Sequence, residues 1–154
     1  MAKTLVLGLG NTLLGDDGIG VLVLDRLGDL GPEVEVVNGA TGGLSLFETL
    51  KGFPKVVVID AVEMGKAPGA IARFSAEELL RLPVSRNFSL HEFGLFEVLK
   101  LGQSLNEDFG HVIIIGVQPK QVLHLESLSS EIEAKMPEIV EKIKQEVNYA
   151  GSYA

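Results

Sequence analysis

Two carboxylates and one imidazole are the side chains of this sequence best placed to do chemistry together. Asp17 belongs to a glycine-rich segment, residues 8–20, that directly follows an apolar run. Asp60 closes another apolar run, and His91 opens the sequence His-Glu-Phe-Gly-Leu. Two carboxylates that share a pocket repel each other, and a divalent cation between them removes that cost. An imidazole nitrogen completes a mixed ligand set that leaves coordination positions for water or substrate. The sequence therefore predicts a divalent-metal or acid–base site at these three residues.

Structural roles compete with this interpretation for the acids. Asp16 and Asp17 also suit the cap of a helix expected to begin near Gly18. Asp60 also suits a turn in which its carboxylate accepts backbone N–H bonds. A charge at that position is costly unless it is paired, hydrogen-bonded or bound to a cation. From the residues alone, both interpretations stay open.

His91 is the histidine that suits chemistry best. Ser89 and Glu92 have the spacing of a capping box, which places His91 in the first turn of a helix. A helix N-terminus disfavours the imidazolium, so the ring stays neutral and able to bind a metal. His111 begins a predicted strand and His124 lies in a connecting stretch, and we interpret both as structural.

Several familiar enzyme motifs are incomplete. The glycine-rich segment has Leu13 where a dinucleotide-binding fingerprint needs glycine, and Asn38 lies where that fingerprint has an acid. It has Asp16 where a P-loop needs lysine. Leu95 replaces the second histidine of a zinc-peptidase motif, and residues 43–47 lack the second glycine of a nucleophile elbow. A glycine-rich loop that carries two acids suits a cation better than a phosphate.

Alternating strands and helices must position these residues. Apolar runs predict strands over residues 3–9, 34–37, 56–59, 69–74 and 111–116. Helical periodicity predicts helices over residues 19–30, 44–50, 76–82, 89–102 and 130–147. Pro137 is expected to kink the last helix or to divide it in two.

The order of these elements indicates the fold class. It predicts an α/β three-layer sandwich: a mostly parallel, mixed sheet of about five strands with helices on both faces. Residues 69–74 are expected to form an edge strand that is antiparallel to its neighbour. Ligands bind beyond the carboxyl ends of the strands in such sheets, where the two acids and the imidazole can converge.

Composition restricts the class of protein. The 154 residues carry a formal charge of −8 and are 46% apolar, which predicts a single domain over residues 1–154. The lack of cysteine excludes thiol nucleophiles, cysteine-zinc sites and disulfides, and it fits a reducing compartment. The acidic balance disfavours nucleic acid and membrane surfaces as partners.

No stretch suits a membrane span or a signal peptide, so the expected location is the cytoplasm. The oligomeric state stays open, with a monomer favoured.

The sequence also resembles a known family, the [NiFe]-hydrogenase maturation endopeptidases. Five matching segments run in order: Gly-Leu-Gly-Asn-Thr-Leu-Leu-Gly-Asp-Asp-Gly-Ile-Gly at 8–20, Gly-Ala-Thr-Gly-Gly at 39–43, Ile-Asp-Ala at 59–61, His-Glu-Phe-Gly-Leu at 91–95 and Gly-Val-Gln-Pro at 116–119. Each segment alone is weak evidence for the family, but the ordered set covers nearly the whole chain and is specific for it.

The resemblance implies a single α/β domain that removes a short C-terminal extension from the large-subunit precursor of a [NiFe] hydrogenase after nickel insertion. It implies that Asp17, Asp60 and His91 hold the catalytic and metal-contacting positions. The nickel would be carried by the precursor, and another divalent cation could replace it in vitro. Two positions depart from the family pattern. Asp17 is commonly glutamate, and Asn38 is aspartate in many members, which argues against a second catalytic carboxylate there. Asn38-Gly39 is also a good turn pair.

Two mechanisms fit these residues. In one, the metal polarises the scissile carbonyl or activates a water while an aspartate acts as base. In the other, Asp17 and Asp60 share a proton as in an aspartic protease. Two functions without peptidase activity stay as alternatives: a nucleotide- or metallocofactor-binding module, and a chaperone that holds the large subunit through exposed apolar loops.

Overall fold

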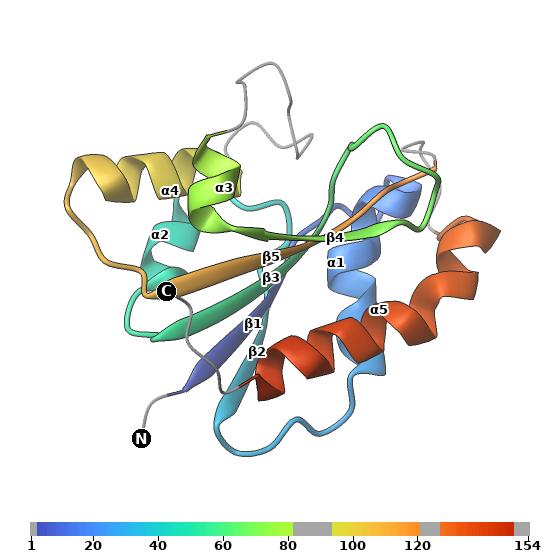
Figure 1. Cartoon of the computed structure of the whole chain (residues 1–154), viewed down its shortest axis with the longest axis horizontal. Helices are drawn as coiled ribbons and strands as arrows, with labels where there is room; N and C mark the ends of the chain where they lie inside the picture. Colours follow the sequence, from blue (N-terminus) through green and yellow to red (C-terminus); the bar gives the residue numbers. More distant parts are fainter. Residues whose placement is uncertain (1–2, 82–93, 121–126, 150–154) are drawn as a thin grey trace.

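A five-stranded sheet forms the centre of the molecule (Figure 1). The computed structural model describes residues 3–81, 94–120 and 127–149. The strands are β1 (Thr4–Gly8), β2 (Val34–Asn38), β3 (Lys55–Ala61), β4 (Ile71–Ser75) and β5 (His111–Val117), in the spatial order β2-β1-β3-β5-β4. β1, β2, β3 and β5 are parallel, and β4 lies antiparallel to β5 at one edge. The prediction of a mostly parallel, mixed sheet with an antiparallel edge strand is confirmed.

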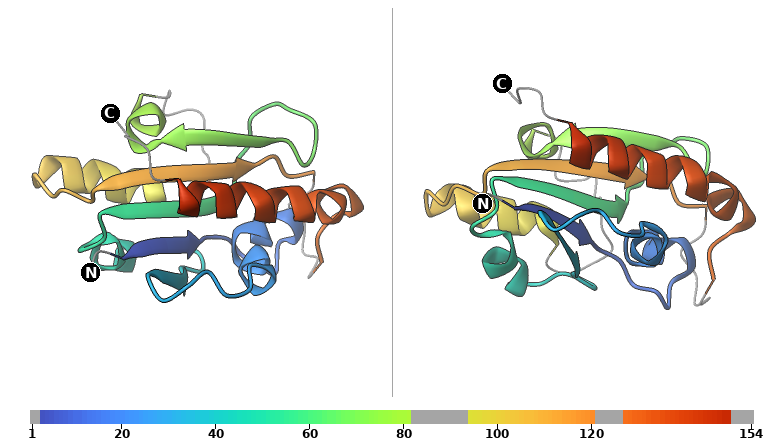
Figure 2. Two further views of the ribbon diagram at one scale, coloured as in Figure 1. Left: turned by 60° about the horizontal axis from the view of Figure 1, so that its bottom comes forward. Right: turned by 90° about the horizontal axis from the view of Figure 1, so that it is seen from below.

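Helices cover both faces of this sheet (Figure 1). On one side lie α1 (Ile19–Leu22), its flanking 3-10 turns η1 (Gly15–Gly18) and η2 (Val23–Arg26), and α5 (Ser130–Asn148). On the other side lie α2 (Ser45–Leu50), α3 (Ala76–Leu80) and α4 (Leu95–Ser104). α5 runs along the length of the strands in both views of Figure 2. The three-layer α/β class is therefore confirmed. Among the described helices, none combines the length and the apolar character that a membrane span requires.

Alternation along the strands divides the core into two apolar layers. In β1, Leu5 and Leu7 pack with the residues of α2 and α4, whereas Val6 packs with those of α1 and α5. In β3, Val58 joins the first layer and Val57 the second. Successive side chains of a strand point to opposite faces, so a parallel strand covered on both sides must be apolar throughout. This requirement explains why the continuous apolar runs predicted the strands correctly.

The first predicted helix, over residues 19–30, is shorter than expected. Its helical turns end at Arg26, within η2. Gly28 follows with a φ of +68°, in the left-handed region where glycine commonly ends a helix. The apolar periodicity continues beyond the turn, so it placed the boundary too late.

The helix predicted to begin at Ser89 begins instead at Leu95. Its N-cap is Gly94, whose backbone is extended and whose N–H donates to the side chain of Glu97 at 3.1 Å. Because the backbone of Gly94 is extended, the prediction of one continuous helix from Ser89 to Gly102 is wrong. The capping box at Ser89, which was the basis for placing His91 in a first helical turn, stays a prediction. Both Ser89 and His91 lie outside the described residues.

The last helix, α5, is one continuous helix of 19 residues with Pro137 inside it. The prediction that Pro137 divides the helix is wrong. Proline removes one backbone hydrogen bond of a helix, and burial of an apolar face can offset that loss. Such a face is present on both sides of the proline, formed by Ile132, Met136, Ile139 and Ile143, all buried.

Candidate functional site

The carboxyl ends of β1 and β3 bring two of the predicted residues to the same edge of the sheet. Asp17 lies in η1, the turn that follows β1, and Asp60 is the penultimate residue of β3. The two strands are parallel neighbours, with Gly8 beside Ile59, so both ends open at the same edge. Asp17 is 2% exposed and Asp60 is 4% exposed. Two acids from separate parts of the chain are thus buried close to each other.

Close backbone packing explains the glycines that surround Asp17. A Cβ on Gly20 would lie 2.2 Å from the carbonyl oxygen of Ile59, and a Cβ on Gly10 would lie 2.2 Å from that of Asp17. Both distances are far shorter than any van der Waals contact. Gly10 also has a φ of +149°, which other residues rarely adopt. Glycine at these positions lets η1 and α1 lie directly against the strand ends, which brings the two acids together.

The side chain of Asp17 points back to the loop that leaves β1. Its Oδ2 accepts a hydrogen bond from the backbone N–H of Asn11 at 2.9 Å. The N-cap residues are Leu14 for η1 and Gly18 for α1, and neither helix start has a side-chain cap. The alternative that Asp17 caps this helix is therefore not what the structure shows.

Asp60 lies inside β3, which continues to Ala61, one residue beyond the end that the sequence predicted at Asp60. Burial raises the pKa of Asp60 well above its ordinary value, and the charge of Asp17 raises it further. A hydrogen bond from the backbone N–H of Ala61, at 2.9 Å, acts in the opposite direction. This bond is the structural role that the sequence offered, but burial outweighs it. Without a cation, Asp60 is therefore disposed to hold a proton.

Asp16 is a buried acid to which the sequence assigned only a capping role near Gly18. Its Oδ1 accepts the backbone N–H of Ser129 at 2.7 Å. Its Oδ2 accepts the N–H of Lys120 and the hydroxyl of Ser129, both at 2.8 Å. Asp16 thus binds the N-cap residue of α5, more than 100 positions away, and no local pattern could have revealed this partner.

Gln118 is a second polar residue that the sequence did not assign to a role. It follows β5, is 3% exposed, and fixes the turn that leaves β3. Its Oε1 accepts the backbone N–H of Met64 at 2.7 Å and that of Lys66 at 3.3 Å, while its Nε2 donates to Glu63 at 3.0 Å. The segments that follow β1, β3 and β5 are therefore joined to one another by buried polar side chains.

Asn38 forms a turn at the end of β2. Its Oδ1 accepts the backbone N–H of Ala40 at 2.8 Å, and Ala40 has a φ of +49°. The carbonyl of Ala40 in turn accepts the N–H of Gly10 at 2.8 Å, which ties this turn to the glycine-rich loop. This geometry is the turn role that the sequence offered for Asn38.

The third predicted residue, His91, lies outside the described residues, as does His124. Within the described ranges, no three His, Cys, Asp or Glu side chains gather closely enough to hold a metal ion. Asp17 and Asp60 supply hard oxygen ligands of the kind that divalent cations accept. The assignment of His91 as their partner stays a prediction.

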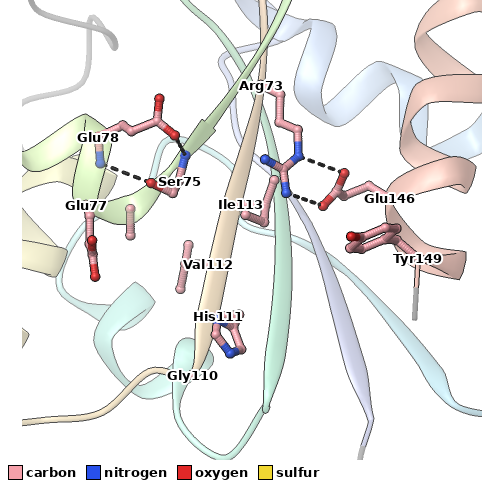
Figure 3. Close-up of a pocket in the computed structure, with 11 residues that line it drawn as sticks. Arg73, Ser75, Glu77, Glu78, Gly110, His111, Val112, Ile113, Glu146 and Tyr149 are labelled. Carbon is pink, nitrogen blue, oxygen red and sulfur yellow. Dashed lines mark hydrogen bonds and ion pairs between the residues drawn. The ribbon is translucent and has the colours of Figure 1, made fainter. Parts of the chain in front are cut away.

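A separate cavity of about 530 Å³ lies at the opposite end of the sheet (Figure 3). It adjoins His111, the first residue of β5, whereas Asp60 lies near the carboxyl end of the neighbouring β3. Arg73 and Glu146 form a two-point ion pair beside it, at 2.9 and 3.0 Å. Neither of the two predicted acids lines this cavity.

Known proteins match almost the whole chain. A family described as hydrogenase maturation protease matches residues 22–146. The hydrogenase expression/formation protein HupD of Thiocapsa roseopersicina is 33% identical over 98% of this chain, which spans 67% of the length of that relative. The hydrogenase 2 maturation protease of Escherichia coli is 29% identical, over 97% of this chain and 93% of its own.

Solved structures agree with these sequence matches. The E. coli hydrogenase maturating endopeptidase HybD superimposes with a TM-score of 0.79 and 29% identity, over 92% of this chain and 89% of its own. The [NiFe] hydrogenase maturation protease HybD of Thermococcus kodakarensis gives a TM-score of 0.77 and 29% identity, over 93% and 97%. These matches support a peptidase over a nucleotide-binding module or a chaperone without peptidase activity. The chain belongs to the hydrogenase maturation protease family.

Proposed function

We propose that this protein is the endopeptidase that removes the C-terminal extension of a [NiFe]-hydrogenase large-subunit precursor once nickel has been inserted. The observation that carries the proposal is the buried pair of Asp17 and Asp60 at the carboxyl edge of the sheet, where the charge of Asp17 helps to raise the pKa of Asp60. Family membership supports the hydrogenase precursor as the substrate. His91 is proposed as the third member of the site.

The electrostatics of the pair suit a substrate that brings its own cation. The free enzyme stabilises a proton on Asp60, because a second charge beside Asp17 is costly in a buried position. A divalent cation removes this repulsion and takes the place of the proton. The chain has no cysteine, so any thiolates that hold the nickel come from the precursor, and the enzyme contributes harder ligands that touch the metal without extracting it.

Hydrolysis requires a base near the scissile peptide. In the metal-assisted form, one of the two carboxylates, or a water that it holds, removes a proton while nickel polarises the carbonyl or activates the water. In the aspartic form, the same two carboxylates share a proton and the nickel only positions the substrate. Both forms make Asp17 and Asp60 catalytic, and they differ in whether chemistry needs the metal.

The decisive experiment incubates purified precursor, with and without nickel, with wild-type enzyme and with the variants Asp17→Asn, Asp60→Asn and His91→Ala. Mass spectrometry of the released C-terminal peptide measures the rate. The exposed Glu35→Gln on β2 is the matched control, and it should cleave at the wild-type rate. Cleavage by all three site variants at the wild-type rate would overturn the assignment. Full-rate cleavage of the nickel-free precursor would remove the metal-assisted form and leave the aspartic one.

We further propose that the enzyme acts in the cytoplasm as a monomer. A cysteine-free chain fits a reducing compartment. Fractionation of cells for both the enzyme and its precursor, and light scattering of the purified protein, test the two statements separately.

A further inference from the structure

Asp16 and Asp17 are consecutive acids whose side chains are held by different partners. Asp16 is bound to Lys120 and to Ser129, at the N-terminus of α5, while Asp17 is bound to Asn11 in the loop that leaves β1. All four residues of η1, which contains both acids, are buried. The two side chains therefore project from one closely packed backbone turn, and a shift of that turn that releases Asp16 also displaces Asp17.

The contact of Asp16 with α5 replaces a local helix cap. Ser129 is the N-cap residue of α5, but it makes no side-chain cap bond to its own helix. Its hydroxyl and its backbone N–H both donate to Asp16 instead. The N-terminus of a long helix carries a partial positive charge, which favours a carboxylate at this position. Asp16 is therefore firmly anchored to an element that is far from Asp17 in sequence.

We propose that Asp16 is a positioning residue, whose anchorage to Ser129 and Lys120 fixes the orientation in which Asp17 meets the substrate. The inference rests on the proposed function, because it takes Asp17 as catalytic. Displacing a catalytic group by about 1 Å can lower the rate by about 10²-fold. Loss of the anchor should therefore reduce kcat while substrate binding by the rest of the surface is retained.

Asp16→Asn is a sharp test because it preserves shape and removes one acceptor. Both oxygens of Asp16 accept backbone N–H bonds, so the amide nitrogen of asparagine must face a donor in either orientation. Ser129→Ala removes only the hydroxyl contact. Ser130→Ala is the matched control, because Ser130 is exposed and its hydroxyl bonds to Glu131 and not to Asp16.

With nickel-loaded precursor, kcat should fall tenfold to hundredfold for Asp16→Asn. It should fall less for Ser129→Ala and not at all for Ser130→Ala. KM should stay within about twofold of the wild-type value in all three variants. The second readout does not use activity. The backbone N–H of Asn11 binds Asp17, so its hydrogen-exchange protection in NMR spectra reports the orientation of Asp17 directly. This protection should fall in Asp16→Asn and persist in Ser130→Ala.

The outcomes separate the two proposals. If Asp17→Asn is inactive while Asp16→Asn keeps the wild-type kcat and the protection of Asn11, the positioning role is wrong and the proposed function stands. If Asp17→Asn is itself fully active, the proposed function fails first. A thermal melt of each variant, with rates expressed per folded molecule, prevents simple unfolding from imitating a loss of kcat. A Ser129→Thr variant that restores the rate lost in Ser129→Ala would confirm that the hydroxyl is what matters.

Discussion

The two ends of the sheet bury charges in opposite ways. At the amino end, Glu146 of α5 is 9% exposed and forms two hydrogen bonds with the guanidinium of Arg73. Lys55 lies nearby and donates to the carbonyls of Glu146 and Tyr149 at the C-terminus of α5, the negative end of the helix dipole. Burial lowers the pKa of Lys55, and the charge of Glu146 acts against that change. Arg73, Glu146 and Lys55 thus each have a partner that carries an opposite charge or partial charge.

At the carboxyl end, three acids, Asp16, Asp17 and Asp60, are buried. Their contacts with the part of the chain that the structure describes include hydrogen bonds from backbone N–H groups and from one hydroxyl. Asp60 experiences the additional charge of Asp17, which raises its pKa. One end of the sheet therefore stabilises the fold, whereas the other keeps an electrostatic cost that a cation or a reaction can relieve.

Loss of the Asp60 carboxylate should have the strongest effect, and it should fall on catalysis. Asp60→Asn keeps the shape of the side chain but cannot act as a base or as an anionic ligand. We expect cleavage of nickel-loaded precursor to slow by about 10²–10⁴-fold. The released peptide, measured by mass spectrometry over time, gives the rate. If Asp60→Asn cleaves the precursor at the wild-type rate, the carboxyl end of the sheet does not have the catalytic role that distinguishes it from the amino end.

The amino end should behave as a purely structural region. Glu146→Gln removes the charge that Arg73 binds and should lower the free energy of unfolding by about 1–2 kcal/mol. Glu141→Gln, at an exposed position of the same helix, is the control and should have almost no effect. Denaturant titration measures both variants. Cleavage per folded molecule should be unchanged, and a lower rate would show that this end also takes part in function.

Gln118 tests whether the carboxyl end also contains structural contacts. Gln118→Met keeps the length of the side chain but removes the acceptor for the N–H groups of Met64 and Lys66. We expect a loss of about 1 kcal/mol, near the lower end of the cost of leaving such groups unbonded. Gln103→Met, at an exposed position of α4, is the control in the same denaturant titration. An equal loss in both variants would contradict the role given to Gln118.

Stability should respond to pH in a way that identifies Asp60. The pKa of Asp60 is higher in the folded protein than in the unfolded chain. The free energy of unfolding is therefore highest, as far as Asp60 is concerned, at pH values below the unfolded pKa, and it decreases as the pH rises through the folded pKa. Asp60→Asn does not titrate. The variant should therefore be more stable than wild type at pH 7, and this advantage should disappear near pH 4, the ordinary pKa of an aspartate. A difference that is independent of pH would contradict the raised pKa.

The weakest effect concerns an exposed pair. Glu131 has its pKa lowered to about 2, chiefly by a hydrogen bond with Lys120. The sign is opposite to that of Asp60: this contribution to stability is present above the ordinary pKa of glutamate and is lost as the pH falls toward about 2. NMR titration of the Glu131 carboxyl in wild type and in Lys120→Met should show the pKa return toward its ordinary value.

The sheet and the positions of Asp17 and Asp60 near its carboxyl edge were predictable from the amino-acid sequence alone. Strands buried on both faces must be apolar throughout, so continuous runs of apolar residues identified β1, β3 and β5. The prediction that Asp60 lies at the carboxyl edge of the sheet followed from the same runs. Helix boundaries were less predictable, because a serine and a glutamate three residues apart recur in the chain. Ser75 and Glu78 form a capping box that begins α3, whereas α4 begins at Leu95, directly after its N-cap Gly94.

The roles of the buried polar residues became visible only in the folded chain. Asp16 and Asp17 are identical neighbours in sequence, yet one is anchored to α5 and the other lies beside Asp60. The pKa of Asp60 depends on its burial and on the nearby charge of Asp17, which follows a different strand. A local sequence pattern gives no information about either. The difference arises from the range of the interactions. Apolar periodicity and turn chemistry act over a few residues, whereas hydrogen bonds and charges in a folded core join residues more than 100 positions apart.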